Sequence, residues 1–192
     1  PRDVLILRTA KHLSELREDA VIATGSKRRA FQLLKLRPDL QIINIRGNVD
    51  TRLRKMEEQQ LDGIVLAAAG LKRLGMEDVI TQYLAPEDMI SAPAQGALAL
   101  EVREDQKELQ KMLDVFCDEE TMNEVCAERN FLEQMGGSCH TPAGARCQKT
   151  DQGYELYAMF GNEDGSKQAY TKVYGTCPEI LAQTAVKNIK KQ

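Results

Sequence analysis

Short apolar runs alternate with helical patterns along residues 20–75. Three of these runs have the length and composition of buried strands: 20–23, 40–45 and 62–69. After the first run, apolar residues recur at three- and four-residue spacing, which predicts a helix capped near Ser26 and ended by Pro38. A second helix is expected from about Asp50 to Gln59. Strands and helices in this alternating order are typical of a parallel sheet with right-handed crossovers.

The pattern changes after the loop-like stretch 91–96. The expected elements are a strand at 97–102, helices at 105–116 and from 118 to the glycine pair 136–137, strands at 154–160 and 167–174, and a helix at 178–190. A turn signal, NEDG, separates the two later strands. This second half therefore predicts a separate small α+β domain that starts near residue 117.

Two strand ends in the first half carry arginines. The segments TGSKRR and RGNVDTR both follow a predicted strand and open a predicted helix. Ligands of parallel sheets sit beyond the carboxyl ends of the strands, where helix N-termini also present unpaired N–H groups. Arginine adds a planar fork that binds a carboxylate through two hydrogen bonds. This edge of the sheet is therefore predicted to bind a polyanion.

The charge distribution agrees with that prediction. The 192 residues carry a net charge of -3, which argues against general nucleic-acid binding. Residues 27–55 nevertheless hold nine basic residues against two acidic ones. A basic region in an acidic protein suggests an anionic partner, although a solvated helix face is the plain alternative.

The remaining bulk features indicate a soluble intracellular protein. Hydrophobic residues make up 42% of the chain, but no apolar run is long enough to span a membrane. The chain begins at Pro1 rather than Met, which is typical of a fragment or a processed product. No secretory leader is visible in the sequence. Five cysteines without a CxxC motif fit a reducing, cytosolic compartment.

Cys139 is the cysteine with the clearest chemical context. It lies in the glycine-flanked loop MGGSCHTPAG, where a thiol can be exposed and His140 could favour its thiolate. An incidental loop cysteine is the plain alternative. A metal site that includes Cys147 lacks a fourth ligand and a zinc-like spacing. A protease-like nucleophile needs a positioned histidine, and only His12 and the adjacent His140 exist.

Five segments resemble, in order and spacing, motifs of the porphobilinogen deaminase family. They are TGSKRR, IRGNVDTRL, LAAAGLKRLG, SAPAQGALALEVR and ERNFLEQMGGSCHTPAGA. The pair RGNVDTRL and AAAGLKRLG is highly specific, and the matches cover about residues 2–150. The resemblance implies an α/β fold, in which a parallel-sheet domain like those of periplasmic binding proteins precedes a small α+β domain.

The resemblance also implies an activity. Members of the family are transferases of tetrapyrrole and heme biosynthesis. They join four porphobilinogen units into hydroxymethylbilane and release ammonia. The pyrrole chain grows on a dipyrromethane cofactor bound covalently to a cysteine, which would be Cys139 here. The acetate and propionate groups of the pyrroles match the predicted polyanion site. By position, the other cofactor-binding residues would be Thr24, Ser26, Arg28, Arg29, Arg46, Arg52, Gln95 and Gly96.

The implied domain organisation has three parts. Residues 1–95 resemble the second domain of the family, 96–116 the segment that returns to the first domain, and 117–192 the C-terminal domain that carries the cofactor cysteine. The family's catalytic aspartate lies in its first domain, which would precede Pro1. No catalytic residue is therefore expected in these residues, and as a fragment the chain is expected to be inactive.

Three positions depart from the family motifs. Gly25 replaces the second residue of the usual TSS, Lys27 stands where an apolar residue is common, and Ser138 replaces a glycine before the cysteine. None of these changes removes a reacting group.

Two hypotheses for the function follow. The first is a cytoplasmic transferase, monomeric as is usual in the family, which binds porphobilinogen and the growing polypyrrole, needs no metal, and binds neither nucleic acid nor a membrane. The second is a non-enzymatic anion-binding module. They differ at Cys139, because a binding module has no need for this thiol.

Overall fold

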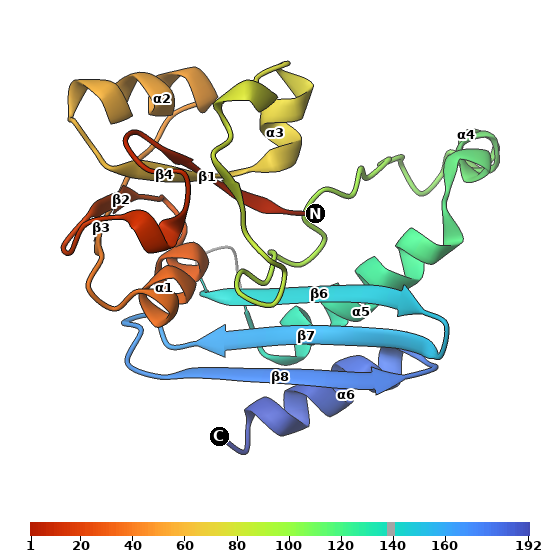
Figure 1. Ribbon diagram of the computed structural model, residues 1–192. Helices are drawn as coiled ribbons and strands as arrows, with labels where there is room; N and C mark the ends of the chain where they lie inside the picture. The colour runs from red at the N-terminus through yellow and green to blue at the C-terminus, as the bar shows by residue number, and fades with distance from the viewer. Residues whose placement is uncertain (138–140) are drawn as a thin grey trace.

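The computed structural model describes residues 1–137 and 141–192. A mixed five-stranded sheet forms the first half, in the order β3-β2-β4-β1-β5 (Figure 1). Its strands are β1 (Asp3–Leu7), β2 (Val21–Ala23), β3 (Gln41–Ile43), β4 (Gly63–Ala67) and β5 (Gln82–Tyr83). The predicted strands β2, β3 and β4 are parallel to one another, as expected. β1 was not predicted, and it runs antiparallel to both of its neighbours, β4 and β5.

Helices cover both faces of this sheet. They are α1 (Lys27–Leu36), α2 (Val49–Glu58) and α3 (Ala68–Arg73), with short 3-10 turns η1 (Leu13–Glu15) and η2 (Glu77–Val79). The side chains of Ser26 and Asn48 cap α1 and α2 by accepting backbone N–H bonds. α1 packs on one face, and α2 and α3 pack on the other (Figure 1). Alternate residues of β1 therefore enter two different cores.

A second, antiparallel sheet forms the C-terminal part. Its strands are β6 (Ala143–Thr150), β7 (Gly153–Gly161) and β8 (Gln168–Gly175). Two helices, α5 (Glu119–Gln134) and α6 (Pro178–Ile189), pack on one face of it and bury Phe131, Leu156 and Leu181. β6 was not predicted, whereas the other four elements lie where the pattern placed them.

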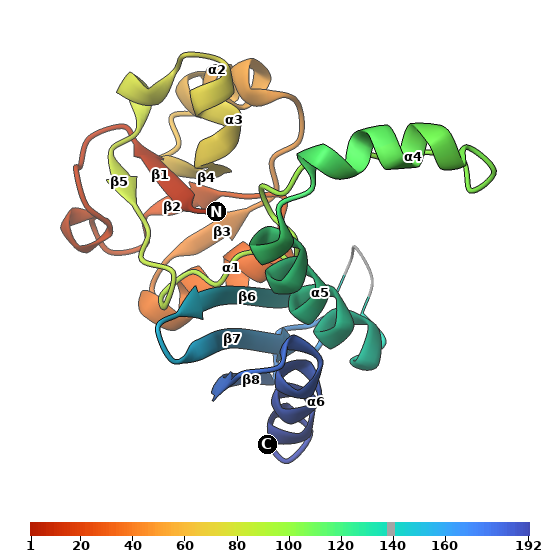
Figure 2. The same cartoon turned by 90° about the vertical axis from the view of Figure 1, so that its right-hand side faces the viewer.

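The connection between the two halves is loosely packed. Residues 97–102 are not a strand, which corrects the prediction, because no neighbouring strand among the described residues pairs with them. Leu98 is 89% exposed despite its apolar side chain. The helix α4 (Lys107–Leu113) and the 3-10 turn η3 (Asp114–Phe116) follow, and α4 projects away from both halves (Figure 2).

The two halves contact each other through α1 and the loop before residue 97. α1 lies between the N-terminal sheet and the C-terminal sheet (Figures 1 and 2). The Ala145 amide donates to the Ser91 carbonyl at 3.0 Å, and Lys27 pairs with Glu163 at 3.8 Å. No helix within the described ranges is long and apolar enough to cross a membrane.

Candidate functional site

The loop between β2 and α1 forms one wall of the candidate site. The hydroxyl of buried Thr24 accepts the Ser26 amide at 3.2 Å, which shapes the turn that opens α1. A side chain at Gly25 would place its Cβ only 2.8 Å from the Ile45 carbonyl oxygen. Gly25 therefore allows the loop after β3 to approach the loop after β2 closely.

A pocket of about 610 Å³ opens at this edge of the sheet. It lies between the two strand-end loops on one side and elements of the C-terminal part on the other. Its lining residues are Thr24, Gly25, Ser26, Lys27, Arg28, Ala30, Ile42, Ile43, Asn44, Arg46, Ala92, Pro93, Leu132, Thr141 and Ala143. The pocket thus joins residues of both predicted arginine segments to the region that follows Cys139 in sequence. Cys139 itself, with Ser138 and His140, lies outside the described residues.

A buried carboxylate, Asp3, binds two of the predicted arginines. Its side chain is 0% exposed, and its two oxygens accept Arg28 and Arg29 at 2.8 Å each. Gln95 donates to the same carboxylate at 3.0 Å and accepts from Arg28 at 3.2 Å. Arg28 also donates to the Ile90 carbonyl. Arg28, Arg29 and Gln95 therefore form one network around Asp3 at the edge of the pocket.

The charges in this network perturb one another. Burial alone would raise the pKa of the Asp3 carboxyl, but the positive charges and hydrogen bonds of Arg28 and Arg29 hold it below its ordinary value. Burial lowers the pKa of the Arg28 guanidinium, and the Asp3 carboxylate counteracts part of that effect.

The structure brings only part of the predicted set to the pocket. Arg28 and Arg46 line it, together with Thr24 and Ser26. Arg29 does not line it and is held by Asp3, and Arg52 donates instead to the Gly47 carbonyl at 2.7 Å. The expected convergence of four arginines on one cleft is therefore seen for two of them.

The two remaining predicted residues lie beside the network. Gln95 contacts Arg28 and Asp3 but is not among the lining residues of the pocket. Gly96 is exposed, with a φ of +90° that favours glycine, and lies near Pro1.

Sequence reasoning missed Asp3 and Lys27 as site residues. An acid at the start of the otherwise apolar run DVLIL was the available signal for Asp3, because a charged residue on a buried strand needs a partner. Lys27 lines the pocket at a position where the family motif is commonly apolar. It therefore adds a further positive charge to the mouth of the site.

The cysteines of the described ranges offer no competing chemistry. Cys147 is buried in the C-terminal core, and burial raises the pKa of its thiol to about 12. Cys117 and Cys126 are exposed. Across residues 1–137 and 141–192, no cluster of three His, Cys, Asp or Glu side chains is placed to hold a metal ion.

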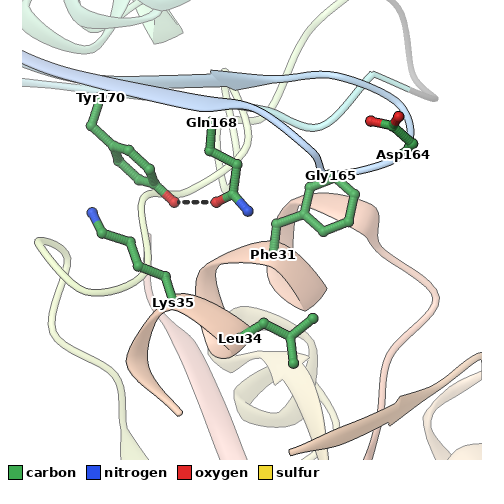
Figure 3. A pocket seen from close by; sticks show the side chains of 7 residues that line it. All are labelled: Phe31, Leu34, Lys35, Asp164, Gly165, Gln168 and Tyr170. Carbon is green, nitrogen blue, oxygen red and sulfur yellow. Dashed lines mark hydrogen bonds between the residues drawn. The ribbon is translucent and has the colours of Figure 1, made fainter. Parts of the chain in front are cut away.

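A second crevice, of about 480 Å³, lies where α1 meets the β7–β8 hairpin (Figure 3). Phe31, Leu34 and Lys35 line it from α1. Asp164, Gly165, Gln168 and Tyr170 line it from the hairpin. The Lys35 ammonium lies 3.4 Å from the centre of the Tyr170 ring. None of the predicted site residues that the structure describes lines this crevice, so we regard it as part of the contact between the two halves.

Comparisons with known proteins agree with the motifs. Residues 1–111 match the family model described as "Porphobilinogen deaminase, dipyromethane cofactor binding domain", and residues 122–191 match "Porphobilinogen deaminase, C-terminal domain". The chain is 50% identical over 189 residues to porphobilinogen deaminase of Lachnospira eligens, a match that covers 97% of this chain and 64% of that protein.

Two further relatives carry the same name. Porphobilinogen deaminase of Clostridioides difficile is 44% identical over 195 residues, which cover all of this chain and 65% of that protein. The protein of Bacillus cereus strain G9842 is 45% identical over 194 residues, which cover 63% of its length. The chain thus spans slightly less than two thirds of the relatives it matches.

Proposed function

Because this chain belongs to the porphobilinogen deaminase family, we propose that it is the cofactor-bearing part of a hydroxymethylbilane synthase. The full-length transferase would join four porphobilinogen units and release ammonia, in the cytoplasm and as a monomer. Dipyrromethane would be attached to Cys139. One observation carries this proposal: residues of both arginine segments line the same pocket as Thr141, two positions after that cysteine.

The residues of the pocket fit an anionic pyrrole chain. When bound, the dipyrromethane would supply the free pyrrole carbon to which the first unit is joined, and each later unit would join the last pyrrole of the growing chain. Arg28 and Arg46 would bind the acetate and propionate groups through charge-assisted hydrogen bonds. Thr24 and Ser26 add hydroxyl groups next to the N-terminus of α1, whose dipole also favours negative charge. Arg29, Arg52, Gln95 and Gly96 would complete the binding residues.

The remaining chemistry would lie outside these residues. We propose that 1–95 is the second domain of the enzyme, that 117–192 is its C-terminal domain, and that 96–116 returns to a first domain that supplies the catalytic aspartate. That aspartate would stabilise the cationic pyrrole intermediates, which is electrostatic catalysis. This chain would then bind and orient the growing polypyrrole.

The test uses the full-length protein and its intact mass. We expect an added mass equal to two pyrrole units, together with consumption of porphobilinogen. Replacing Cys139 by Ser should abolish both. The matched control is Cys117→Ser, because Cys117 is an exposed thiol that lies outside the cysteine motif. A full-length protein with a bare mass and no turnover would favour the anion-binding module instead.

A polypeptide of only these 192 residues should behave differently. We expect a bare mass, a free Cys139 thiol and no turnover, because one wall of the cleft would be missing. Positioning can supply roughly 7–11 kcal/mol of a reaction barrier, and much of that would be lost. An added mass that disappears in Cys139→Ser would show that these residues load the cofactor unaided.

A further inference from the structure

The direction of β1 determines where Asp3 lies in the sheet. Because β1 runs antiparallel to β4, its first residue lies beside Ala67, the last residue of β4. Asp3 therefore sits at the carboxyl edge of the parallel strands, next to the loop that opens α1. A β1 strand parallel to β4 would have placed this carboxylate at the opposite edge of the sheet.

The carboxylate binds three side chains from two different segments. Arg28 and Arg29 come from α1, whereas Gln95 comes from the loop that follows residue 90. The side chain of Arg28 is only 6% exposed, and that of Arg29 is 12% exposed. Removing Asp3 would leave both guanidinium groups buried without their countercharge, which is costly.

The positive and negative charges of the Asp3 network are unequal in number. One carboxylate faces two guanidinium groups, so the network carries one net positive charge when no ligand is bound. The Nε atom of Arg29 is buried and lacks a hydrogen-bond partner among the described residues. A ligand carboxylate at the pocket would supply the missing negative charge.

We propose that Asp3 is a positioning residue, which fixes the guanidinium of Arg28 toward the pocket and leaves one positive charge for an incoming carboxylate. The role rests on the proposed function, because the carboxylate in question is that of the pyrrole chain. Asp3 acts through the arginines and touches no reacting atom.

Asp62 provides a matched control in the same sheet. It is also a buried aspartate, with a side chain 8% exposed, and it binds Arg17 at 2.8 Å and the Val21 amide at 2.8 Å. It precedes β4, so it lies at the opposite edge of the sheet from the pocket. Asp62→Asn therefore removes the pair of a buried aspartate with an arginine that is 60% exposed, without touching the site.

The first measurement needs neither a variant nor a substrate. Nuclear magnetic resonance of arginine side chains in the full-length protein should show hindered rotation and slow hydrogen exchange for Arg28 and Arg29. The exposed Arg46 should show fast averaging. Free rotation of the Arg28 and Arg29 groups would overturn the proposal even if the enzyme is active. This measurement also holds if porphobilinogen is not the substrate.

The second measurement is the kinetics of the full-length variants. Asp3→Asn should raise the KM for porphobilinogen about tenfold or more and change kcat less than about threefold, because substrate binding is weakened. Asp62→Asn should change KM less than about twofold. The double variant Asp3→Asn/Arg28→Gln should raise KM less than the product of the two single effects, since both changes break the Asp3–Arg28 pair while only Asp3→Asn breaks the pair with Arg29. Equal KM effects at Asp3 and Asp62, or a double effect equal to the product of the single effects, would assign Asp3 a purely structural role. Absence of turnover in the unmodified protein would refute the proposed function and leave the first measurement to decide on Asp3.

Discussion

At the scale of single residues, Glu128 is another buried carboxylate that joins distant segments. It lies on α5 and is 4% exposed. Its two oxygens accept the Ala94 amide at 2.6 Å and the Cys147 amide at 2.8 Å. Burial nevertheless dominates and raises the pKa of its carboxyl to about 7. One side chain thus connects the loop beside the pocket to the C-terminal sheet.

This raised pKa predicts how stability depends on pH. Between about pH 4.5 and 7 the folded state binds more protons at Glu128 than the unfolded state, so the free energy of unfolding should fall as the pH rises. The full loss is about 3 kcal/mol. Urea unfolding at several pH values should show this loss in the unmodified protein and not in Glu128→Gln.

A neighbouring residue supplies the control for that measurement. Glu124 lies one turn earlier on α5 and is only partly buried; its charge contributes to the raised pKa of Glu128 less than burial does, so Glu124→Gln should keep most of the pH dependence. The lowered pKa values of Asp3 and Asp62 act in the opposite direction and at lower pH, where their stabilising effect is lost as they become protonated. An unchanged pH profile in Glu128→Gln would contradict the prediction.

The candidate site was predictable in part. Strand ends and helix starts placed Thr24, Ser26, Arg28 and Arg46 at one edge of a sheet, and these four line the pocket. The direction of a side chain depends on partners that local patterns do not contain. Arg28 and Arg29 follow each other on α1 and therefore point about 100° apart, and Asp3 binds both only because β1 folds back beside β4.

At the scale of elements, strand patterns were less informative than helix patterns. Residues 97–102 alternate like a strand but have no pairing partner in the described part of the chain. β6, in contrast, begins AGARC and is rich in residues with low strand propensity, yet it pairs along its whole length with β7. In both segments, cross-strand pairing determines whether a strand forms, and this pairing depends on tertiary structure. Most helices were found because their caps and spacing are local, but α3 was not predicted, and it begins inside the strand expected at 62–69.

The contact between α1 and the β7–β8 hairpin depends on one glycine. A side chain at Gly165 would place its Cβ 2.7 Å from the Phe31 ring, and the φ of Gly165 is +77° (Figure 3). Only a residue without a side chain fits here. Gly165 therefore allows the β7–β8 hairpin to pack closely against Phe31 of α1.

Gly165→Ala should destabilise the protein through both effects. The left-handed backbone and the overlap with Phe31 together should cost about 2–4 kcal/mol. The control is Gly75→Ala, because Gly75 has a similar φ of +68° but no atom within 4 Å of the added Cβ. It should cost about 1 kcal/mol from the backbone alone. Urea unfolding measures both, and equal losses would show that the contact with Phe31 contributes nothing.

At the scale of the whole molecule, apolar exposure is concentrated along the connection between the two sheets. Large apolar side chains there are strongly exposed: Leu98 at 89%, Leu100 at 61%, Met112 at 69%, Val115 at 78% and Phe116 at 73%. Several strongly exposed apolar side chains within one segment suggest an interaction site. A first domain of the full-length enzyme, to which this segment is proposed to return, would cover them.

The polypeptide of these 192 residues should therefore associate with itself. Leu98→Ser combined with Phe116→Ser should shift it toward the monomer in sedimentation velocity experiments, because the exposed apolar area is reduced. Leu74→Ser combined with Ile180→Ser should not, since these residues are exposed but lie outside the connection. A monomer at all concentrations without substitutions would contradict this prediction.

β1 is an interior strand of the sheet, and this position has a consequence for the synthesis of the protein. Both of its neighbours come from later sequence, because β4 begins at residue 63 and β5 at residue 82. At about 5–20 residues per second, a ribosome needs roughly 3–15 s to make them after β1. During that interval the nascent chain carries an unpaired strand whose five residues are all buried in the finished fold. The strand that brings Asp3 to the arginines is thus a segment that a ribosome-associated chaperone is expected to protect.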